Sequence, residues 1–238
     1  MHMVFTGNPG TAKTTVARLM AKVLAENGVL DSGRFHEVGR ADLIGKYVGH
    51  TAPLVREAFA KAKGGLLFID EAYSLVDERR GLFGDEAINT IVQEMENHRD
   101  DTIVVFAGYP EPMESFLDRN VGLRSRVAFH VSFPDYSVEE LCCIAESIAA
   151  QDGLTLNEEA KDRLRPLFAS ACREKDFGNG RYARKVIEQA CMAQANRLFD
   201  PERGEPDPAQ LCVLTAEDIA CPSAVKSPRA QPLIGFCG

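Results

Sequence analysis

The sequence lacks the features that would assign it to several special classes of protein. No apolar run approaches the roughly 18 residues that a membrane span needs, and no charged stretch followed by an apolar core marks a secretory signal. The seven cysteines all lie in the second half without metal-ligand spacing, and the five histidines form no zinc-type pair. We therefore expect a cytoplasmic protein with no membrane partner. Its cysteines are expected to be buried, reduced thiols, with a redox role as the alternative.

An excess of positive charge is also absent. The chain has 27 Lys and Arg residues against 35 Asp and Glu residues, a net charge of -8, and both halves are acidic. A protein that binds nucleic acid or an anionic membrane through its overall charge has the opposite balance. We therefore predict no nucleic-acid partner, although a local basic site stays possible. With 45% hydrophobic and 26% charged residues, the composition is that of a globular protein rather than a disordered one.

The first part of the chain, residues 1–133, alternates short apolar runs with helical patterns. This is typical of an α/β domain whose parallel sheet has helices on both faces. The expected strands are 3–6, 66–69, 102–107 and 127–133, with 35–38 as a weaker candidate, and the expected helices are 13–27, 53–63 and 85–98.

The pattern changes after Pro134. We predict a helical domain over 134–221 and a loosely held tail over 222–238. Its expected helices are 137–150 with a Ser137–Glu140 capping box, 157–175 capped by Asn157, and 180–199, followed by a loop at 200–210, a strand at 211–214 and a turn at 216–220.

Residues 7–14, Gly-Asn-Pro-Gly-Thr-Ala-Lys-Thr, lie between an expected strand and an expected helix. They are close to the P-loop pattern of Gly, four residues, then Gly-Lys-Ser/Thr, which suits phosphate because backbone N–H groups and a helix N-terminus face the anion. Lys13 is expected to reach the β- and γ-phosphates of ATP and to assist catalysis, and the Thr14 hydroxyl to ligate Mg²⁺. The expected nucleotide contacts are Gly7, Asn8, Pro9, Gly10, Thr11, Ala12, Lys13, Thr14 and Thr15. Ala12 stands where the pattern has glycine, which costs little at negative φ and more at positive φ.

The run Leu66–Ile69 ends at Asp70-Glu71. Parallel strands present their carboxyl ends to the ligand, so both carboxylates should lie beside the P-loop. We predict that Asp70 holds the Mg²⁺ hydration shell and that Glu71 is the base that orients and polarises the attacking water. The alternative is that the two residues only cap the next helix.

A P-loop, an Asp-Glu pair and a helical second domain together resemble an AAA+ ATPase. The order of further segments is similar to the CbbX/CfxQ family, which includes the red-type Rubisco activases and the stage V sporulation protein K group. EccA-type secretion ATPases share much of the same pattern. The segments that carry the resemblance are 7–16, Asp42-Leu43 with Tyr47-Val48-Gly49, 68–75, 106–109, 122–126 and 178–184.

The resemblance implies a ring, expected to be a hexamer, that remodels a protein substrate. Tyr47 and Val48 match the pore loop that grips a polypeptide, although Tyr47 in a core is the alternative. Arg126, with Arg124 second, matches the arginine finger that acts on the neighbouring subunit's nucleotide; a surface ion pair is the alternative. Arg181, with Arg184 as second candidate, matches the sensor-2 residue that reaches the γ-phosphate from the helical domain.

The sequence departs from the general AAA+ pattern in two places. Residues 107–110, Ala-Gly-Tyr-Pro, replace the polar sensor-1 residue that helps to place the water, and what fills that role is left open. Only six residues precede Gly7, whereas AAA+ modules carry an earlier segment that contacts adenine. We therefore expect a chain short of its N-terminal segment, with weak nucleotide binding.

These observations predict Mg²⁺-dependent ATP hydrolysis coupled to remodelling of a protein partner, as in the stage V sporulation protein K group. Three alternatives remain: a red-type Rubisco activase, a nucleotide-gated scaffold that does not hydrolyse ATP, and a DNA-acting ATPase. The acidic charge of both halves argues against the last.

Overall fold

The computed structural model describes residues 1–47, 49–76, 81–174, 177–199 and 208–220. The chain divides into two compact units, Met1–Asp135 and Tyr136–Gly238, which are described separately below. The expected tail at 222–238 and most of the expected loop at 200–210 lie outside the described residues. None of the described helices combines the length and the apolar character that crossing a membrane requires.

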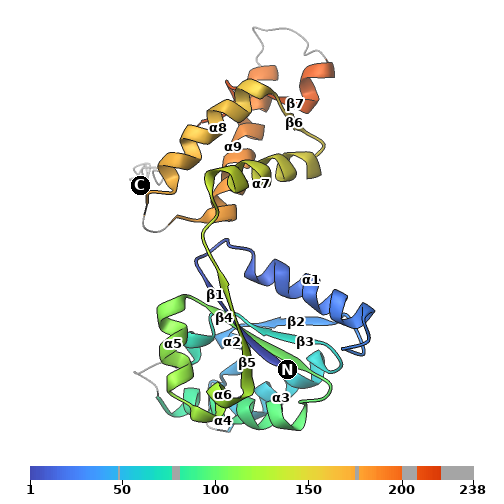
Figure 1. The fold of residues 1–238 in the computed structure, drawn as a ribbon, viewed down its shortest axis with the longest axis vertical. Helices are drawn as coiled ribbons and strands as arrows, with labels where there is room; N and C mark the ends of the chain where they lie inside the picture. Colours follow the sequence, from blue (N-terminus) through green and yellow to red (C-terminus); the bar gives the residue numbers. More distant parts are fainter. Residues whose placement is uncertain (48, 77–80, 175–176, 200–207, 221–238) are drawn as a thin grey trace, which may run out of the picture. The chain divides into compact units, whose positions relative to one another are not determined.

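The first unit is built on a sheet of five parallel strands in the order β2-β3-β4-β1-β5 (Figure 1). The strands are β1 (His2–Gly7), β2 (Phe35–Val38), β3 (Leu66–Ile69), β4 (Ile103–Gly108) and β5 (Val127–Phe133). All five expected strands are confirmed, including the weaker candidate at 35–38. Three strands, β2, β3 and β5, have the predicted bounds.

Helices cover both faces of the sheet (Figure 1). Helix α1 (Lys13–Glu26) packs on one face, and α3 (Thr51–Ala62), α4 (Gly81–Asn97), α5 (Pro110–Asp118) and α6 (Val121–Arg126) pack on the other. The short helix α2 (Arg40–Leu43) and the 3₁₀ turn η1 (Ala72–Leu75) belong to this second layer. Sequence patterns missed α5 and α6, because Pro110, Pro112 and Gly122 weaken the helical signal there.

The centre of the sheet shows why its strands read as unbroken apolar runs. Leu67 and Ile69 of β3 pack under α3 and α4, whereas Leu66 and Phe68 pack under α1, and all four side chains are fully buried. The edge strand β5 differs, because Phe129 and Val131 keep 47% and 38% of their surface exposed. The core is therefore centred on β3 and β4 and thins toward β5.

The second unit packs α7 (Val138–Gln151), α8 (Glu158–Ala171) and α9 (Asn179–Leu198) around one apolar cluster. Two short strands, β6 (Thr155–Leu156) and β7 (Val213–Leu214), pair in parallel, and the 3₁₀ turn η3 (Pro208–Cys212) precedes β7. The Ser137–Glu140 capping box and the Asn157 cap are both confirmed. Helix α8 ends four residues before the predicted 175.

The prediction of buried cysteines is only partly right. Cys142 and Cys191 are partly buried, and burial raises the pKa of both thiols. Cys143, Cys172 and Cys212 are exposed, so the prediction is wrong for these three. In α7 the reason is the helical period: Leu141, Ala145 and Ile148 form the buried face, and Cys143 lies off it. Cys221 and Cys237 lie outside the described residues.

Candidate nucleotide site

The register of the sheet brings the P-loop and the acidic pair to the same edge. Val4 of β1, Phe106 of β4 and Ile69 of β3 lie level with one another. The P-loop leaves β1 from Gly7, and Asp70 follows Ile69 directly. Since β4 alone separates β1 from β3, the two chain segments start about 10 Å apart, which is two strand spacings.

The P-loop is a tight turn with two residues in the left-handed region. Gly10 has φ 77°, and Ala12, the N-cap of α1, has φ 66°. The sequence left open whether alanine in place of glycine is costly at position 12. Because φ is positive there, the alanine side chain is strained. The Thr11 hydroxyl donates to the Asn8 carbonyl at 2.8 Å and holds the turn closed.

Lys13 and Asn8 make the polar contacts of the loop. The Lys13 ammonium donates to the carbonyl oxygens of Gly7 and Asn8, at 2.8 Å each. The Asn8 side chain donates to both carboxylate oxygens of Asp135 at 2.9 Å. Lys13 therefore lies across the first turn of the loop, and its contact with phosphate stays a prediction.

The acidic pair occupies a strained turn at the end of β3. The Asp70 N–H donates to the Val38 carbonyl of β2, and Asp70 Oδ1 accepts the Glu71 N–H at 3.0 Å. Glu71 is exposed, with φ 47° and ψ 47°. A glutamate in the left-handed region costs about 1–2 kcal/mol, and such strain clusters at functional sites. Glu71 makes no side-chain cap to η1, which argues against the capping alternative for this residue.

The end of β4, where the sensor-1 residue was missing, is crowded by an aromatic side chain. A Cβ on Gly108 would lie 2.8 Å from Tyr73 Cδ1 and 2.8 Å from the Met113 side chain. The Tyr73 and Tyr109 ring centroids are 6.0 Å apart. Burial, with the charge of Glu71 next in importance, raises the pKa of Tyr73 to about 12. Sequence reasoning missed Tyr73, although it lies two residues after Glu71.

Donors suited to Mg²⁺ are present at this edge. Thr14 lies in the first turn of α1 with its hydroxyl oxygen, and Asp70 supplies carboxylate oxygens. Mg²⁺ prefers oxygen ligands and usually binds through one or two protein groups together with phosphates and water. Within the described part of the chain, no three His, Cys, Asp or Glu side chains gather as an all-protein cage would require. The residues therefore fit Mg²⁺ that arrives with a nucleotide.

Both finger candidates lie on α6 and have intramolecular acidic partners. Arg126 Nη2 lies 3.1 Å from Glu96 Oε2, and its Nη1 donates to the Gly122 carbonyl at 3.2 Å. Arg124 pairs with Asp118. In the single chain, both arginines therefore form ion pairs, as the alternative interpretation expected. Their role as an arginine finger toward a neighbouring subunit stays a prediction.

The pore-loop candidate is exposed. Tyr47 keeps 68% of its surface accessible, and its ring meets His50 edge-on at 5.5 Å between centroids. The alternative of a core tyrosine is therefore wrong. Val48 lies outside the described residues, and the gripping role of Tyr47 stays a prediction.

The sensor-2 candidates belong to the second unit. Arg181 and Arg184 are exposed and lie one turn apart in the first half of α9. The helix starts at Asn179, which is fully buried with φ 47° and accepts the Tyr136 N–H on its Oδ1 at 2.9 Å. The buried Asn179 therefore fixes the start of the helix that carries both arginines. Their contact with nucleotide stays a prediction.

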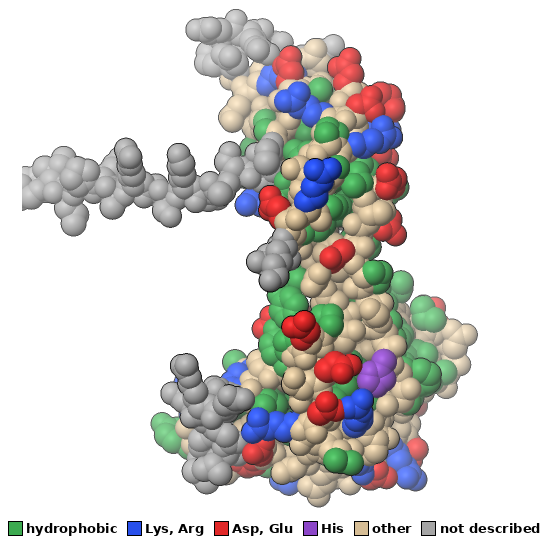
Figure 2. Space-filling model, turned by 60° about the vertical axis from the view of Figure 1, so that its left-hand side comes forward, with side chains coloured by type: hydrophobic (Ala, Val, Ile, Leu, Met, Phe, Trp, Pro, Cys, Tyr) green, Lys and Arg blue, Asp and Glu red, His purple; other side chains and the backbone are tan. Residues whose placement is uncertain are grey.

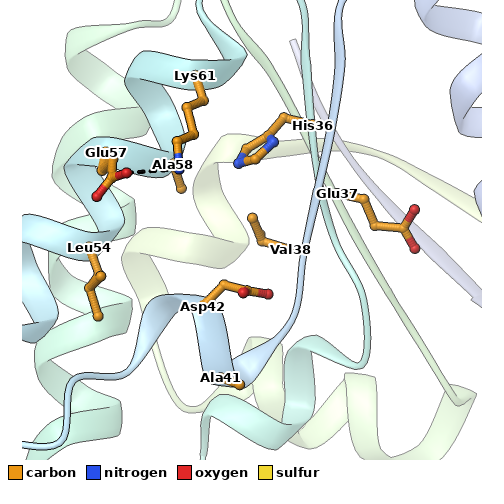
Figure 3. Close-up of a pocket in the computed structure, with 9 residues that line it drawn as sticks. All are labelled: His36, Glu37, Val38, Ala41, Asp42, Leu54, Glu57, Ala58 and Lys61. Carbon is orange, nitrogen blue, oxygen red and sulfur yellow. Dashed lines mark ion pairs between the residues drawn. The ribbon is translucent and has the colours of Figure 1, made fainter.

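A hollow of about 290 Å³ lies between β2, α2 and α3 (Figure 3). Lys61 pairs with Glu57 at 2.7 Å on its wall. Burial and the Lys61 charge lower the pKa of His36, which lies opposite. Because Lys61 already pairs with Glu57, and Glu37 and Asp42 add negative charge to the lining, the hollow does not favour an anionic ligand. Over the face in Figure 2, acidic and basic side chains are interspersed without a basic stripe.

Two family models match consecutive parts of the chain. The model of the ATPase family associated with various cellular activities (AAA) matches residues 3–135, and that of the AAA lid domain matches 137–229. Among solved structures, the FIGL-1 AAA domain in complex with ADP covers 91% of this chain with a TM-score of 0.63 at 20% identity; the match covers 68% of that chain.

Curated relatives are considerably more similar. Protein CbbX of Cereibacter sphaeroides is 45% identical over 92% of this chain and 71% of its own length. The CfxQ homolog of Trieres chinensis is 44% identical over 92% and 76%. The chloroplastic ribulose bisphosphate carboxylase/oxygenase activase of Cyanidioschyzon merolae is 42% identical over 92% and 75%. Together with the parallel sheet, the P-loop and the helical unit, these matches show that the chain is an AAA+ ATPase, which uses ATP with Mg²⁺, and belongs to the CbbX/CfxQ family.

Proposed function

We propose that this ATPase hydrolyses ATP at the edge formed by β1, β4 and β3, and that a ring of six subunits couples hydrolysis to remodelling of a protein partner. The observation that carries the proposal is the shared level of the strand ends, from which the P-loop and Asp70-Glu71 leave the sheet toward one ligand. Members of this family act on proteins, and Tyr47 offers an exposed aromatic contact for a polypeptide.

The proposed mechanism assigns a step to each group. Backbone N–H groups of residues 7–15 bind the phosphates, and Lys13 moves from the loop carbonyls to the β- and γ-oxygens. Thr14 and Asp70 hold Mg²⁺, which neutralises phosphate charge when bound. Glu71 accepts a proton from the attacking water.

Arginines complete the proposed site from two sources. Arg126, or Arg124 in second place, leaves its acidic partner and stabilises charge on the neighbouring subunit's γ-phosphate. Arg181, or Arg184, senses the same phosphate from the helical unit. Supplying the finger from a second subunit couples hydrolysis to assembly.

Phosphate release is the first test. Wild type should show Mg²⁺-dependent turnover, and Glu71→Gln should lower it at least about 100-fold while ATP still binds. A nucleotide-gated scaffold would show no turnover that depends on Glu71. Salt-sensitive binding to DNA would instead support the DNA-acting alternative.

The arginine finger is tested with a matched pair of variants. Arg126→Ala should bind ATP normally and lose turnover. Arg119→Ala is the control, because Arg119 also pairs with an acidic residue in this unit, Asp85 at 3.6 Å. Equal, normal turnover in both variants would remove Arg126 from the site. A mass measurement with and without ATP tests the ring of six.

The partner is tested through Tyr47. The names of the relatives favour Rubisco as the partner over the sporulation protein K reading, so reactivation of an inhibited red-type Rubisco is the assay. Tyr47→Ala should abolish reactivation and leave basal ATP hydrolysis intact, whereas equal loss of both would refute the pore role.

A cytoplasmic location stays a prediction, to be checked by fractionation.

A further inference from the structure

The central strand β4 ends between the two halves of the site. Thr6 pairs with Gly108, and β4 also pairs with β3, so Gly108 lies between the start of the P-loop and the turn that holds Glu71. The general AAA+ pattern has a polar residue at the end of this strand that helps to place the attacking water. Residues 107–110, Ala-Gly-Tyr-Pro, replace that residue, so another group must place the water.

The ring of Tyr73 fills the space that Gly108 leaves. A Cβ on Gly108 would lie 2.8 Å from Tyr73 Cδ1, which is closer than real Cβ contacts, so only glycine admits the ring in this position. The ring also packs against the apolar core under β3 and β4 and faces Tyr109 at 6.0 Å. Tyr73 is thus held from two sides at the end of β4.

Tyr73 lies on the turn that follows the acidic pair. It belongs to the turn η1, whose Ser74 N–H donates to the Glu71 carbonyl at 2.7 Å, so the ring and the carboxylate are carried by one short turn. Burial, followed by the charges of Glu71, Tyr109 and Asp70, keeps the pKa of Tyr73 near 12. The hydroxyl therefore stays protonated at neutral pH and can donate a hydrogen bond to a carboxylate or to water.

We propose that Tyr73 is a positioning residue of the ATPase site: its hydroxyl orients Glu71 and the attacking water, the role of the polar residue that is missing at Gly108. The proposal rests on the proposed nucleotide site, because it assigns Tyr73 a role only through Glu71. It also gives a reason for the glycine at the end of β4, since any larger residue there would displace the ring.

The decisive variant is Tyr73→Phe, which keeps the ring against Gly108 and removes only the hydroxyl. We expect kcat for phosphate release to fall about 10-fold, as for a lost hydrogen bond to a charged group, with ATP-analogue affinity within about twofold of wild type. Tyr109→Phe is the matched control, because it makes the same chemical change on the neighbouring ring. It should keep the wild-type kcat. Unfolding temperatures of both variants show whether either change is structural.

Each outcome decides the proposal. A wild-type kcat in Tyr73→Phe, an equal loss in Tyr109→Phe, or a loss of affinity and unfolding temperature that parallels the loss of kcat would each overturn it. Glu71→Gln is measured beside them. If Glu71→Gln is inactive and Tyr73→Phe is normal, only the role of Tyr73 fails. If Glu71→Gln turns over normally, the proposed site fails and the role of Tyr73 with it.

A second variant tests the space itself. Gly108→Ala should push the Tyr73 ring away and lower kcat at least as much as Tyr73→Phe. In a Tyr73→Phe background the same change should add little further loss of kcat, because the hydroxyl is already gone. Multiplied losses in the double variant would contradict a shared role.

Discussion

Glu71 in the α/β unit and Asp218 in the helical unit are both acidic residues, yet their surroundings are opposite. Asp218 is 1% exposed, forms two hydrogen bonds of 2.8 Å with Arg197, and accepts the N–H and hydroxyl of Thr215 at 2.9 Å. Glu71 is exposed on a strained backbone at the end of β3. The helical unit thus uses its carboxylate to hold structure, whereas the α/β unit leaves one exposed on a strained turn at the edge where we propose that nucleotide binds.

The same contrast separates the strained residues. Ala12 and Glu71 have positive φ beside the ligand edge of the sheet, and neither is buried. Asn179 has the same φ in the helical unit, but it is fully buried and its side chain binds backbone groups of Tyr136 and Phe177. Strain is compensated locally in the second unit and left uncompensated in the first, as expected of a site that awaits a partner.

Removing Asp218 should produce the largest change in stability. Asp218→Ala leaves Arg197 without its partner at a site where the Arg197 side chain is 16% exposed, and we expect the free energy of unfolding to fall by about 3 kcal/mol. Denaturant titration measures it. The control is Glu217→Ala, because Glu217 is exposed beside it and its loss should cost under about 0.5 kcal/mol. Equal effects would remove the contrast between the units.

Acid should destabilise the two units in different pH ranges. In the α/β unit, His2 is 4% exposed and accepts the Val104 N–H; burial first, and then the charge of Arg126, lower its pKa to about 4, although a backbone hydrogen bond at Met95 and the charge of Glu96 act in the other direction. The unfolded chain therefore takes up this proton near pH 6.5 and the folded chain only near 4. Stability is complete above 6.5 and falls by at most about 3 kcal/mol as the pH drops from 6.5 to 4.

Asp218 behaves in the opposite sense. Burial would raise its pKa, but the hydrogen bonds from Arg197 and Thr215 lower it below the ordinary value. Its contribution is therefore complete above about pH 4 and is lost as the pH falls through the lower, folded pKa. Unfolding followed by residue-resolved hydrogen exchange between pH 7 and 3 separates the units. His2→Gln should flatten the dependence of the unfolding free energy on pH between 6.5 and 4 only. An unchanged slope in that range would contradict the assignment of this dependence to His2.

Replacing Glu71 should uncouple stability from activity. Glu71→Gly relieves the left-handed strain and should raise the free energy of unfolding by about 1 kcal/mol, while phosphate release is lost. Glu71→Ala removes the same carboxylate but keeps a Cβ at φ 47°, so it should lose activity without the gain in stability. Thermal unfolding with a phosphate assay distinguishes them, and equal stability in the two variants would show that the turn is unstrained.

The smallest expected effect is at Ala12. Ala12→Gly restores a residue that tolerates φ 66° and should add about 0.5 kcal/mol to stability without weakening nucleotide binding. The matched control is Ala17→Gly, inside α1 and fully buried, which should cost about 1 kcal/mol. A loss of stability in Ala12→Gly would mean that the loop backbone relaxes when the side chain is absent.

The sequence predicted the sheet well because burial on both faces leaves a simple signature. The run Leu66–Ile69 is uniformly apolar, and its strand has the same bounds. The P-loop and the Asp-Glu pair were recognisable for a related reason, since each comes directly after a strand. The helix Pro110–Asp118 was missed, because two prolines in its first turn hide a start that proline in fact favours.

Backbone angles and side-chain contacts that depend on tertiary packing could not be predicted from the sequence. The φ of Ala12 follows from how the whole loop turns. The approach of Tyr73 to Gly108 follows from the pairing of β3 with β4, which joins residues 37 positions apart. The pair between Arg126 and Glu96 likewise depends on how α6 packs beside α4. Motif reading finds the groups that are proposed to touch the nucleotide but misses the residues that pack beside them.

The contact between Asn8 and Asp135 has a consequence for the boundary between the units. Asn8 belongs to the loop that is proposed to wrap the phosphates, and Asp135 is the last residue of the first unit. These hydrogen bonds tie the Asn8 side chain to Asp135, to which Tyr136 is covalently joined. The Tyr136 N–H in turn binds Asn179, where α9 begins. The two residues at the boundary between the units are therefore each held by an asparagine of their own unit, Asp135 by Asn8 of the P-loop and Tyr136 by Asn179 at the start of α9.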